Sequence, residues 1–72
     1  MWKNLSDAQT LAEIGRRLKA TRLERGLSQE ALAKAAGVSL PKVQRVELRG
    51  QVTVEHLIRL LRPLDLLDGL HA

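Results

Sequence analysis

The sequence predicts an all-α fold, a compact bundle of four or five short helices. Hydrophobic residues make up 44% of the 72 residues and aromatic residues only 1%, so leucine, valine, isoleucine and alanine have to form the core. Serine and threonine residues, which cap helix N-termini well, precede apolar residues spaced three and four positions apart. A chain of this length forms one small domain, and its modest core would gain stability from dimerisation.

The first helix is expected to begin at Asp7, or one turn later where Thr10 offers a second cap. Ser6 and Gln9 have the spacing of a capping box, in which each side chain bonds to the backbone of the other residue. Gly26 can end the helix. Between these limits runs an apolar stripe at helical spacing, formed by Leu11, Ile14 and Leu18.

The second helix is expected from Gln29 to about Ala36. Ser28 can cap it, and Leu27 with Leu32 has the spacing of a hydrophobic staple across its first turn. Gly37 follows, where a helix commonly closes in the left-handed conformation that glycine adopts without strain.

The third helix is expected from Leu40 to about Glu47, after a cap at Ser39. Val43 and Val46 are three residues apart and share its buried face. Ala33 on the preceding helix is small enough to let the third helix cross closely. Two short helices at a steep angle, joined by a tight turn, form a helix-turn-helix.

The fourth helix is expected after Thr53, which follows a loop over residues 48–52. Pro63 removes a hydrogen bond and clashes with the turn before it, so a break or kink is expected near Arg62. Residues 65–70 then form a short fifth helix or a turn. The leucines here face either the bundle or a second subunit: Leu64, Leu66, Leu67 and Leu70.

The segment LSQEALAKAAGVSLPKVQRVE, residues 27–47, resembles the helix-turn-helix of the phage repressor and Cro regulators, also called the XRE family. The resemblance covers about residues 11–61. It implies a bundle of the phage-repressor type in which the third helix reads DNA bases. It rests on a small residue, a glycine and two apolar residues at the positions of the family motif: Ala33, Gly37, Val43 and Val46.

Three regions follow from these patterns. Residues 1–10 form an N-terminal arm and helix start, and residues 11–62 form the DNA-binding domain, with the helix-turn-helix at 28–47. Residues 63–72 form a leucine-rich segment for a dimer or partner contact. Charge divides the chain in the same way: residues 16–49 hold nine lysines and arginines against three glutamates, and no lysine or arginine follows residue 63. The basic part of the chain is suited to bind a polyanion, and the apolar C-terminal segment is suited to contact another protein.

Base contacts are expected from exposed residues near the N-terminus of the third helix, because this end enters the major groove. Arg45 is the best candidate, since a guanidinium can bind guanine O6 and N7 bidentately, and Gln44 can bind an adenine edge. Leu40 and Pro41 stand where many relatives carry polar or basic residues. They can contact thymine methyl groups, or the protein relies more on DNA shape.

Phosphate contacts are expected around the base-reading residues, from basic and polar side chains and from amides at helix N-termini. By resemblance, Gln29 at the start of the second helix touches a phosphate. Any one of these residues could instead be an ordinary solvated side chain. The full set comprises Gln29, Lys42, Arg49, Gln51 and Thr53.

The resemblance also assigns a structural role to Arg22 and Glu47. In the family, an arginine late in the first helix and a glutamate at the end of the recognition helix often form a partly buried ion pair, and these two residues match those positions. The alternative is that both side chains are simply solvated.

Enzymatic function is not expected. The three serines all stand at helix starts, where capping explains them, and two histidines are too few for a metal site or a catalytic triad. The five glycines are isolated, so the chain has no phosphate-binding loop. We predict no catalytic residue, no metal and no cofactor. With no cysteine, no membrane-spanning apolar run and no signal-peptide pattern, the expected location is the cytoplasm, at the nucleoid.

Two functions from different classes fit these observations. The first is a transcriptional regulator that binds double-stranded DNA as a homodimer and represses its own gene. The second is an antitoxin that neutralises a toxin protein through its apolar C-terminal part and represses the shared operon, since small antitoxins paired with HipA-like kinases resemble this chain in size and layout. A third, weaker alternative is a helix-turn-helix that makes only protein contacts.

Overall fold

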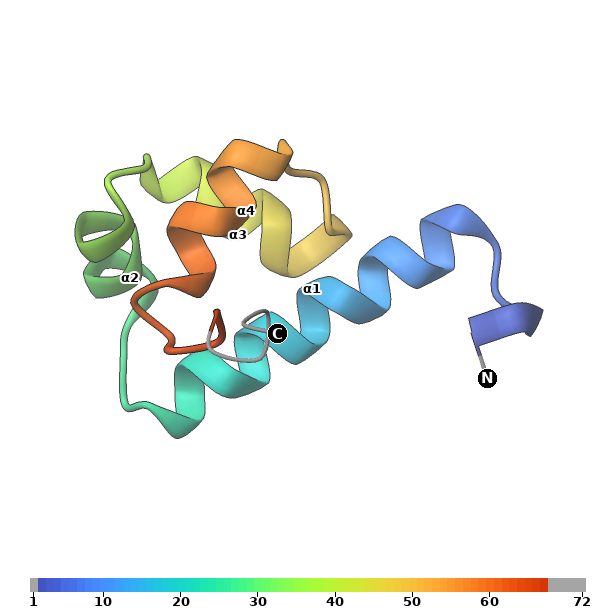
Figure 1. The fold of residues 1–72 in the computed structure, drawn as a ribbon, viewed down its shortest axis with the longest axis horizontal. Helices are drawn as coiled ribbons and strands as arrows, with labels where there is room; N and C mark the ends of the chain where they lie inside the picture. Colours follow the sequence, from blue (N-terminus) through green and yellow to red (C-terminus); the bar gives the residue numbers. More distant parts are fainter. Residues whose placement is uncertain (1, 68–72) are drawn as a thin grey trace.

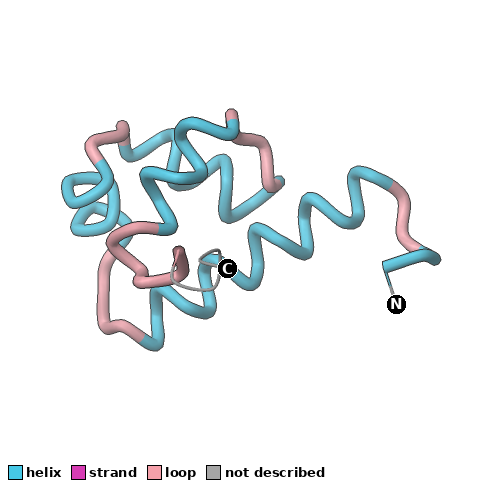
Figure 2. The backbone as a smooth tube through the Cα atoms, in the orientation of Figure 1, coloured by secondary structure: helices cyan, strands magenta, loops and turns pink. Residues whose placement is uncertain are grey.

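The computed structural model describes residues 2–67, and every regular element in that range is helical. A short 3₁₀ helix, η1 (Trp2–Asn4), precedes α1 (Asp7–Glu24), α2 (Gln29–Ala36), α3 (Leu40–Arg49) and α4 (Val54–Leu61). In Figure 1, α2, α3 and α4 gather around the C-terminal half of α1, while its N-terminal half extends away from the bundle with η1 at the tip. The tube in Figure 2 shows the short loops that join these helices. The predicted all-α bundle is confirmed.

The helix starts follow from local capping. The Ser6 hydroxyl accepts the backbone N–H of Gln9 at 3.1 Å, and the Gln9 side chain accepts the backbone N–H of Ser6 at 2.8 Å. This complete capping box places the start of α1 at Asp7, the first of the two predicted alternatives. Ser28, Ser39 and Thr53 each accept a backbone N–H from the third residue after them and cap α2, α3 and α4. Such a cap contributes about 1 kcal/mol to stability.

Helix α3 is longer than predicted, because it continues through Leu48 and Arg49. The loop expected over residues 48–52 therefore begins only at Gly50. This glycine has φ 70°, and its N–H donates to the Val46 carbonyl at 2.7 Å, which closes the helix. A Cβ at residue 50 would lie 1.9 Å from the backbone oxygen of Leu11, so both the left-handed conformation and the packing against α1 require glycine.

The core is aliphatic and draws on all four α-helices and the turn after them. A Cβ at Gly15 would lie 2.3 Å from the carbonyl oxygen of Val46, so this glycine lets α1 and α3 approach backbone to backbone. The fully or almost fully buried hydrophobic residues are Leu18, Leu32, Ala33, Ala36, Val43, Val46, Leu60 and Leu64.

The segment after α4 decides, for Leu64, between the bundle and a second subunit. Helix α4 ends at Leu61 with Arg62 as its C-cap, in agreement with the break expected before Pro63. Leu64 is 0% exposed within the single chain, so its side chain belongs to the bundle core and is not available to a second subunit or a partner. Leu66 is 38% exposed, and Leu67 is half-buried. Leu70 lies outside the described residues.

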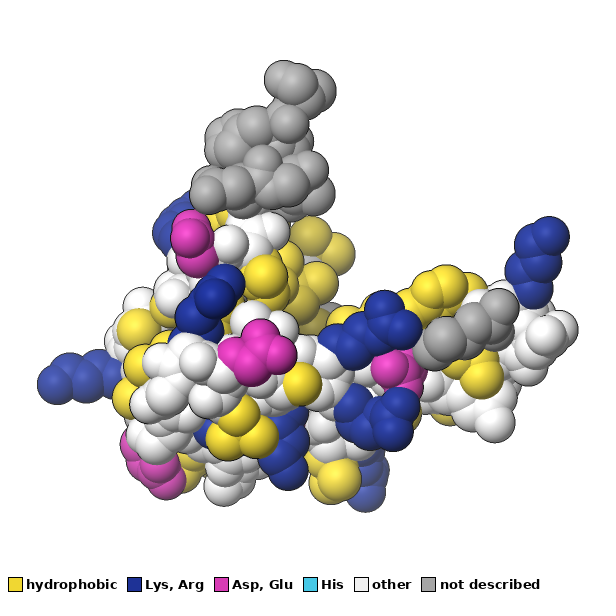
Figure 3. Space-filling model, turned by 90° about the horizontal axis from the view of Figure 1, so that it is seen from below, with side chains coloured by type: hydrophobic (Ala, Val, Ile, Leu, Met, Phe, Trp, Pro, Cys, Tyr) yellow, Lys and Arg dark blue, Asp and Glu magenta, His cyan; other side chains and the backbone are white. Residues whose placement is uncertain are grey.

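The projecting half of α1 leaves an apolar hollow on the molecule. Leu11 and Ile14, two residues of the apolar stripe, are 42% and 40% exposed, because the N-terminal half of α1 extends past α3. Hydrophobic side chains gather in the corner where this half of α1 meets the bundle (Figure 3). We call this corner the apolar hollow; it has a volume of about 220 Å³ and is lined mainly by Trp2, Ile14, Leu57, Leu61 and Leu66. Among residues 2–67, no helix combines the length and the apolar character that crossing a membrane requires.

Candidate nucleic-acid interface

Helix α3 presents two faces with different chemistry. Val43, Val46 and Glu47 point into the bundle and are buried. On the other side, the predicted base-reading residues Pro41, Gln44 and Arg45 are exposed, and Leu40 is half-buried. The capped N-terminal part of the helix therefore carries polar, cationic and apolar groups together on one exposed surface.

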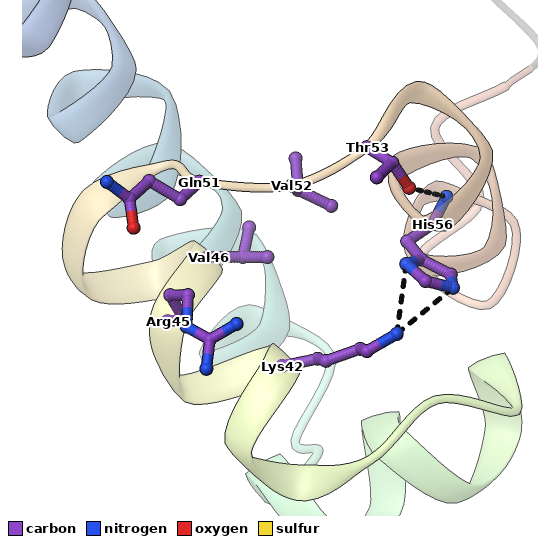
Figure 4. A pocket seen from close by; sticks show the side chains of 7 residues that line it. All are labelled: Lys42, Arg45, Val46, Gln51, Val52, Thr53 and His56. Carbon is purple, nitrogen blue, oxygen red and sulfur yellow. Dashed lines mark hydrogen bonds between the residues drawn. The ribbon is translucent and has the colours of Figure 1, made fainter.

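A cationic hollow lies between α3 and the start of α4. It has a volume of about 320 Å³ and is formed by α3, the loop after it and the first turn of α4. In Figure 4 the side chain of Lys42 extends from α3 toward the imidazole of His56 on α4. The hollow is lined by Lys42, Arg45, Val46, Gln51, Val52, Thr53 and His56. The fold thus brings three predicted phosphate contacts, Lys42, Gln51 and Thr53, to the same place as Arg45.

His56 also lines this hollow, and no role for it was predicted from the sequence. Lys42 Nζ lies 3.3 Å from both ring nitrogens of His56, and both side chains are half-buried. The backbone N–H of His56 donates to the Thr53 hydroxyl at 3.2 Å, so the N-cap of α4 fixes the position of the histidine. The available signal was the spacing: a histidine three residues after a predicted cap lies in the first turn of the helix.

Arg49 lies on the neighbouring surface, farther along α3. With Gln44, Arg45 and Leu48 it lines a second, shallow hollow of about 220 Å³. Arg49 is exposed, as expected of a phosphate contact, and it shares this surface with Gln44 and Arg45, two of the four residues predicted to contact bases.

Gln29 is placed differently from the other predicted phosphate contacts. Its side-chain Nε2 donates to Glu47 Oε1 at 3.1 Å, and the residue is half-buried. One amide hydrogen is therefore used inside the protein, while the second hydrogen on the same nitrogen remains for a phosphate oxygen.

Behind α3, Arg22 and Glu47 form a buried ion pair. Arg22 Nε donates to Glu47 Oε2 at 2.6 Å, and Arg22 Nη2 donates to Oε1 at 3.0 Å, with side-chain exposures of 7% and 4%. Arg22 Nη1 also donates to the Leu27 carbonyl at 2.7 Å. The hydrogen bond to Glu47 raises the pKa of the Arg22 guanidinium, although burial opposes this effect. The pair joins α1, the start of α2 and α3 in one network, and within residues 2–67 no buried side-chain nitrogen or oxygen lacks a partner.

Comparisons with known proteins agree with this geometry. Residues 13–72 match a family described as a helix-turn-helix domain. Among solved structures, a chain of a SinR protein/SinI protein complex is similar, with a TM-score of 0.67 and 34% sequence identity. The match covers 81% of this chain and 63% of that chain, so this chain spans less than two thirds of the length of that chain. No curated protein sequence matches at a significant level.

The family match covers most of the chain, including the capped α2 and α3 and the turn between them. The solved structure shares the helical fold at substantial sequence identity. The chain therefore belongs to the helix-turn-helix domain family, with the fold of the phage repressor and Cro type.

Proposed function

We propose that the protein is a sequence-specific repressor that binds its operator as a homodimer and controls its own gene. The observation that carries this proposal is the exposed face of α3, where Gln44 and Arg45 stand beside the cationic hollow and the buried Arg22–Glu47 pair fixes the helix from behind. Such an arrangement allows base contacts from one helix and phosphate contacts from its surroundings. The proposed site of action is the nucleoid, in the cytoplasm.

In the proposed complex, the roles divide according to side-chain chemistry. Arg45 binds a guanine edge and Gln44 an adenine edge, while Leu40 and Pro41 contact thymine methyl groups or follow the shape of the groove. The phosphates are held by the basic and polar groups around α3, namely Gln29, Lys42, Arg49, Gln51 and Thr53.

A homodimer would place two copies of α3 in successive major grooves. Half-sites would then lie about 34–36 Å apart along the duplex. The apolar hollow supports this part of the proposal, because Trp2, Ile14 and Leu66 leave apolar surface that a second protein could cover. Leu66 and Leu67 remain candidates for that contact, whereas the side chain of Leu64 is buried in the core of the same chain.

A second candidate function is that of an antitoxin that binds a toxin and represses their shared operon. The same apolar hollow favours it, since a partner protein could bind there while α3 binds DNA. The similar solved chain belongs to a complex of two different proteins, SinR and SinI. Co-purification with the product of an adjacent gene would distinguish this function from a repressor that acts alone.

A salt-dependent mobility-shift assay on the DNA upstream of the protein's own gene tests the main proposal. Arg45→Ala is expected to weaken specific binding by about 1–3 kcal/mol. Arg59→Ala is a matched control, because Arg59 is exposed, pairs with Glu55 at 3.2 Å and lines neither hollow of α3. With about 6–10 phosphate contacts, affinity should fall roughly 10³–10⁵-fold between about 50 and 200 mM salt. Equal, salt-independent affinity for upstream and random DNA would refute the proposal and favour a helix-turn-helix that makes only protein contacts.

A further inference from the structure

We infer that His56 and Lys42 together hold one phosphate of the DNA backbone and that the imidazole takes up a proton as this phosphate binds. DNA affinity would then be coupled to pH through a single side chain. The inference rests on the proposed DNA-binding function of α3 and extends it to a residue outside the helix-turn-helix.

A neutral imidazole suits the contact between Lys42 and His56. The lysine ammonium has three N–H donors and no acceptor, so it can donate only to a ring nitrogen that carries no proton. Lys42 Nζ is 3.3 Å from both Nδ1 and Nε2, and an ammonium equally distant from both nitrogens lies over the ring, because in the ring plane it would clash with the carbon between them. In either neutral tautomer one ring nitrogen carries no proton, so the contact does not bring two cations together.

Protonation of His56 removes this acceptor. Both ring nitrogens become donors, so the imidazolium and the ammonium, 3.3 Å apart, present only positive charge and N–H groups to each other. An anionic oxygen between the two cations would satisfy both sets of donors. The proton comes from the solvent, the phosphodiester is chemically unchanged, and no covalent bond forms or breaks.

The surroundings of His56 make an anion the fitting occupant. Among residues 2–67, Lys42 and Arg45 from α3 are the charged side chains that line the hollow with it, and no carboxylate from this range lines it. On α4, Glu55 is paired with Arg59. On α2, which packs against α4, the charged residues Glu30 and Lys34 do not line the hollow.

The hollow is also open to the surface that α3 offers to DNA. Figure 4 shows Arg45 and Lys42 on successive turns of α3 at one side of the space and His56 on α4 at the other. Thr53 caps α4 through the His56 N–H, so a phosphate in the hollow would meet the side-chain cations beside the start of this helix. A phosphate at this position would lie beside the base-reading residues.

The test is fluorescence anisotropy with a labelled random-sequence duplex of about 20 base pairs at constant salt, between about pH 5.5 and 7.5. A phosphate contact does not depend on sequence, so the probe is independent of the operator. Uptake of one proton can tighten binding by at most about tenfold per pH unit. Wild-type affinity is expected to rise about 3–10-fold as the pH falls from about 7.5 to about 5.5, mainly through His56.

Three variants separate this mechanism from other causes of pH dependence. His56→Gln cannot titrate and should flatten the pH dependence to less than about twofold. His56→Lys stays positively charged over the whole pH range. At about pH 7.5 it should therefore bind the duplex as tightly as the wild type does at about pH 5.5. His71→Gln, which changes the other histidine of the chain, should behave like the wild type. Circular dichroism checks that all variants are folded, which is expected because the cap to Thr53 uses only the His56 backbone.

Calorimetry in PIPES and in Bis-Tris at about pH 6.5 measures the proton directly, because the two buffers differ in their enthalpies of ionisation. A net uptake of up to one proton per chain in the wild type, absent in His56→Gln, would support the inference. The same pH dependence in His56→Gln as in the wild type would overturn it while leaving the proposed function intact. Failure of the wild type to bind either random or upstream DNA at low salt would overturn the proposed function and this inference together.

Discussion

Removing the charge of Glu47 should destabilise the protein far more than any change on its surface. In Glu47→Gln the Arg22 guanidinium stays buried, at 7% side-chain exposure, without its carboxylate. Breaking one side of such a pair costs about 3–5 kcal/mol. A domain of 72 residues has a total free energy of unfolding of about 4–11 kcal/mol at roughly 0.05–0.15 kcal/mol per residue. The substitution therefore removes a large part of the stability.

The assay is urea and thermal denaturation followed by circular dichroism, with Glu55→Gln as the matched control. Glu55 pairs with Arg59 on the surface of α4, at 70% and 45% exposure, so its loss should cost at most about 1 kcal/mol. For Glu47→Gln the Tm should fall by at least about 12 °C, since each kcal/mol corresponds to about 4–8 °C in a domain of this size. Equal Tm values for the two variants would refute the view that the buried pair fixes α3.

The same pair also predicts how stability responds to alkaline pH. The hydrogen bond to Glu47 raises the pKa of Arg22 in the folded state. A raised pKa means that the contribution of Arg22 is fully present below its unfolded-state pKa and is lost only as the pH rises through the folded-state value, at strongly alkaline pH. Titration of Arg22 should therefore leave the free energy of unfolding unchanged between about pH 5 and 9.

Three further predictions test the packing and the interface. Gly50→Ala and Gly37→Ala both place alanine at φ 70°, but only the Cβ at residue 50 would meet the backbone of α1, so Gly50→Ala should cost about 1–3 kcal/mol more in urea denaturation. Leu60→Ala removes a side chain that is 0% exposed and should cost about 2–5 kcal/mol, whereas Val54→Ala, at 74% exposure, should stay within about 0.5 kcal/mol of the wild type. Arg49→Ala should weaken binding about equally on specific and random duplexes and reduce the slope of log affinity against log salt by about 1, so a loss confined to one sequence would contradict a phosphate contact.

The sequence predicts most of the fold because the helix starts are determined locally. Each N-cap side chain bonds a backbone N–H only three residues away, so a serine or threonine before an apolar stripe is sufficient to locate the helix. The end of α3 is harder to predict from the sequence, since Leu48 and Arg49 fit a helix as well as a loop. Only Gly50, by adopting φ 70° and bonding the Val46 carbonyl, decides where the helix ends.

Features that depend on tertiary geometry could not be predicted in the same way. The stripe of Leu11 and Ile14 correctly indicates a helix, but their exposure depends on how far α1 extends past its neighbours. The burial of Leu64 depends on the turn after α4 folding back onto the core. The contact of Lys42 with His56 spans 14 residues and two helices, and no local pattern in the sequence encodes it.

The helical periodicity of α3 places the residues that stabilise the fold and the residues proposed to contact DNA on different faces of the helix. Val43, Val46 and Glu47 recur at helical spacing and are buried, while Gln44 and Arg45 fall between them and are exposed. The buried face is determined by packing and by one ion pair, so its residues can vary little without loss of the fold. The exposed face contributes little to packing, so substitutions there should change the proposed DNA contacts while the fold stays the same. One ten-residue helix can thus hold the fold together on one side and leave the other side free for the proposed base contacts, because successive residues along it point in different directions.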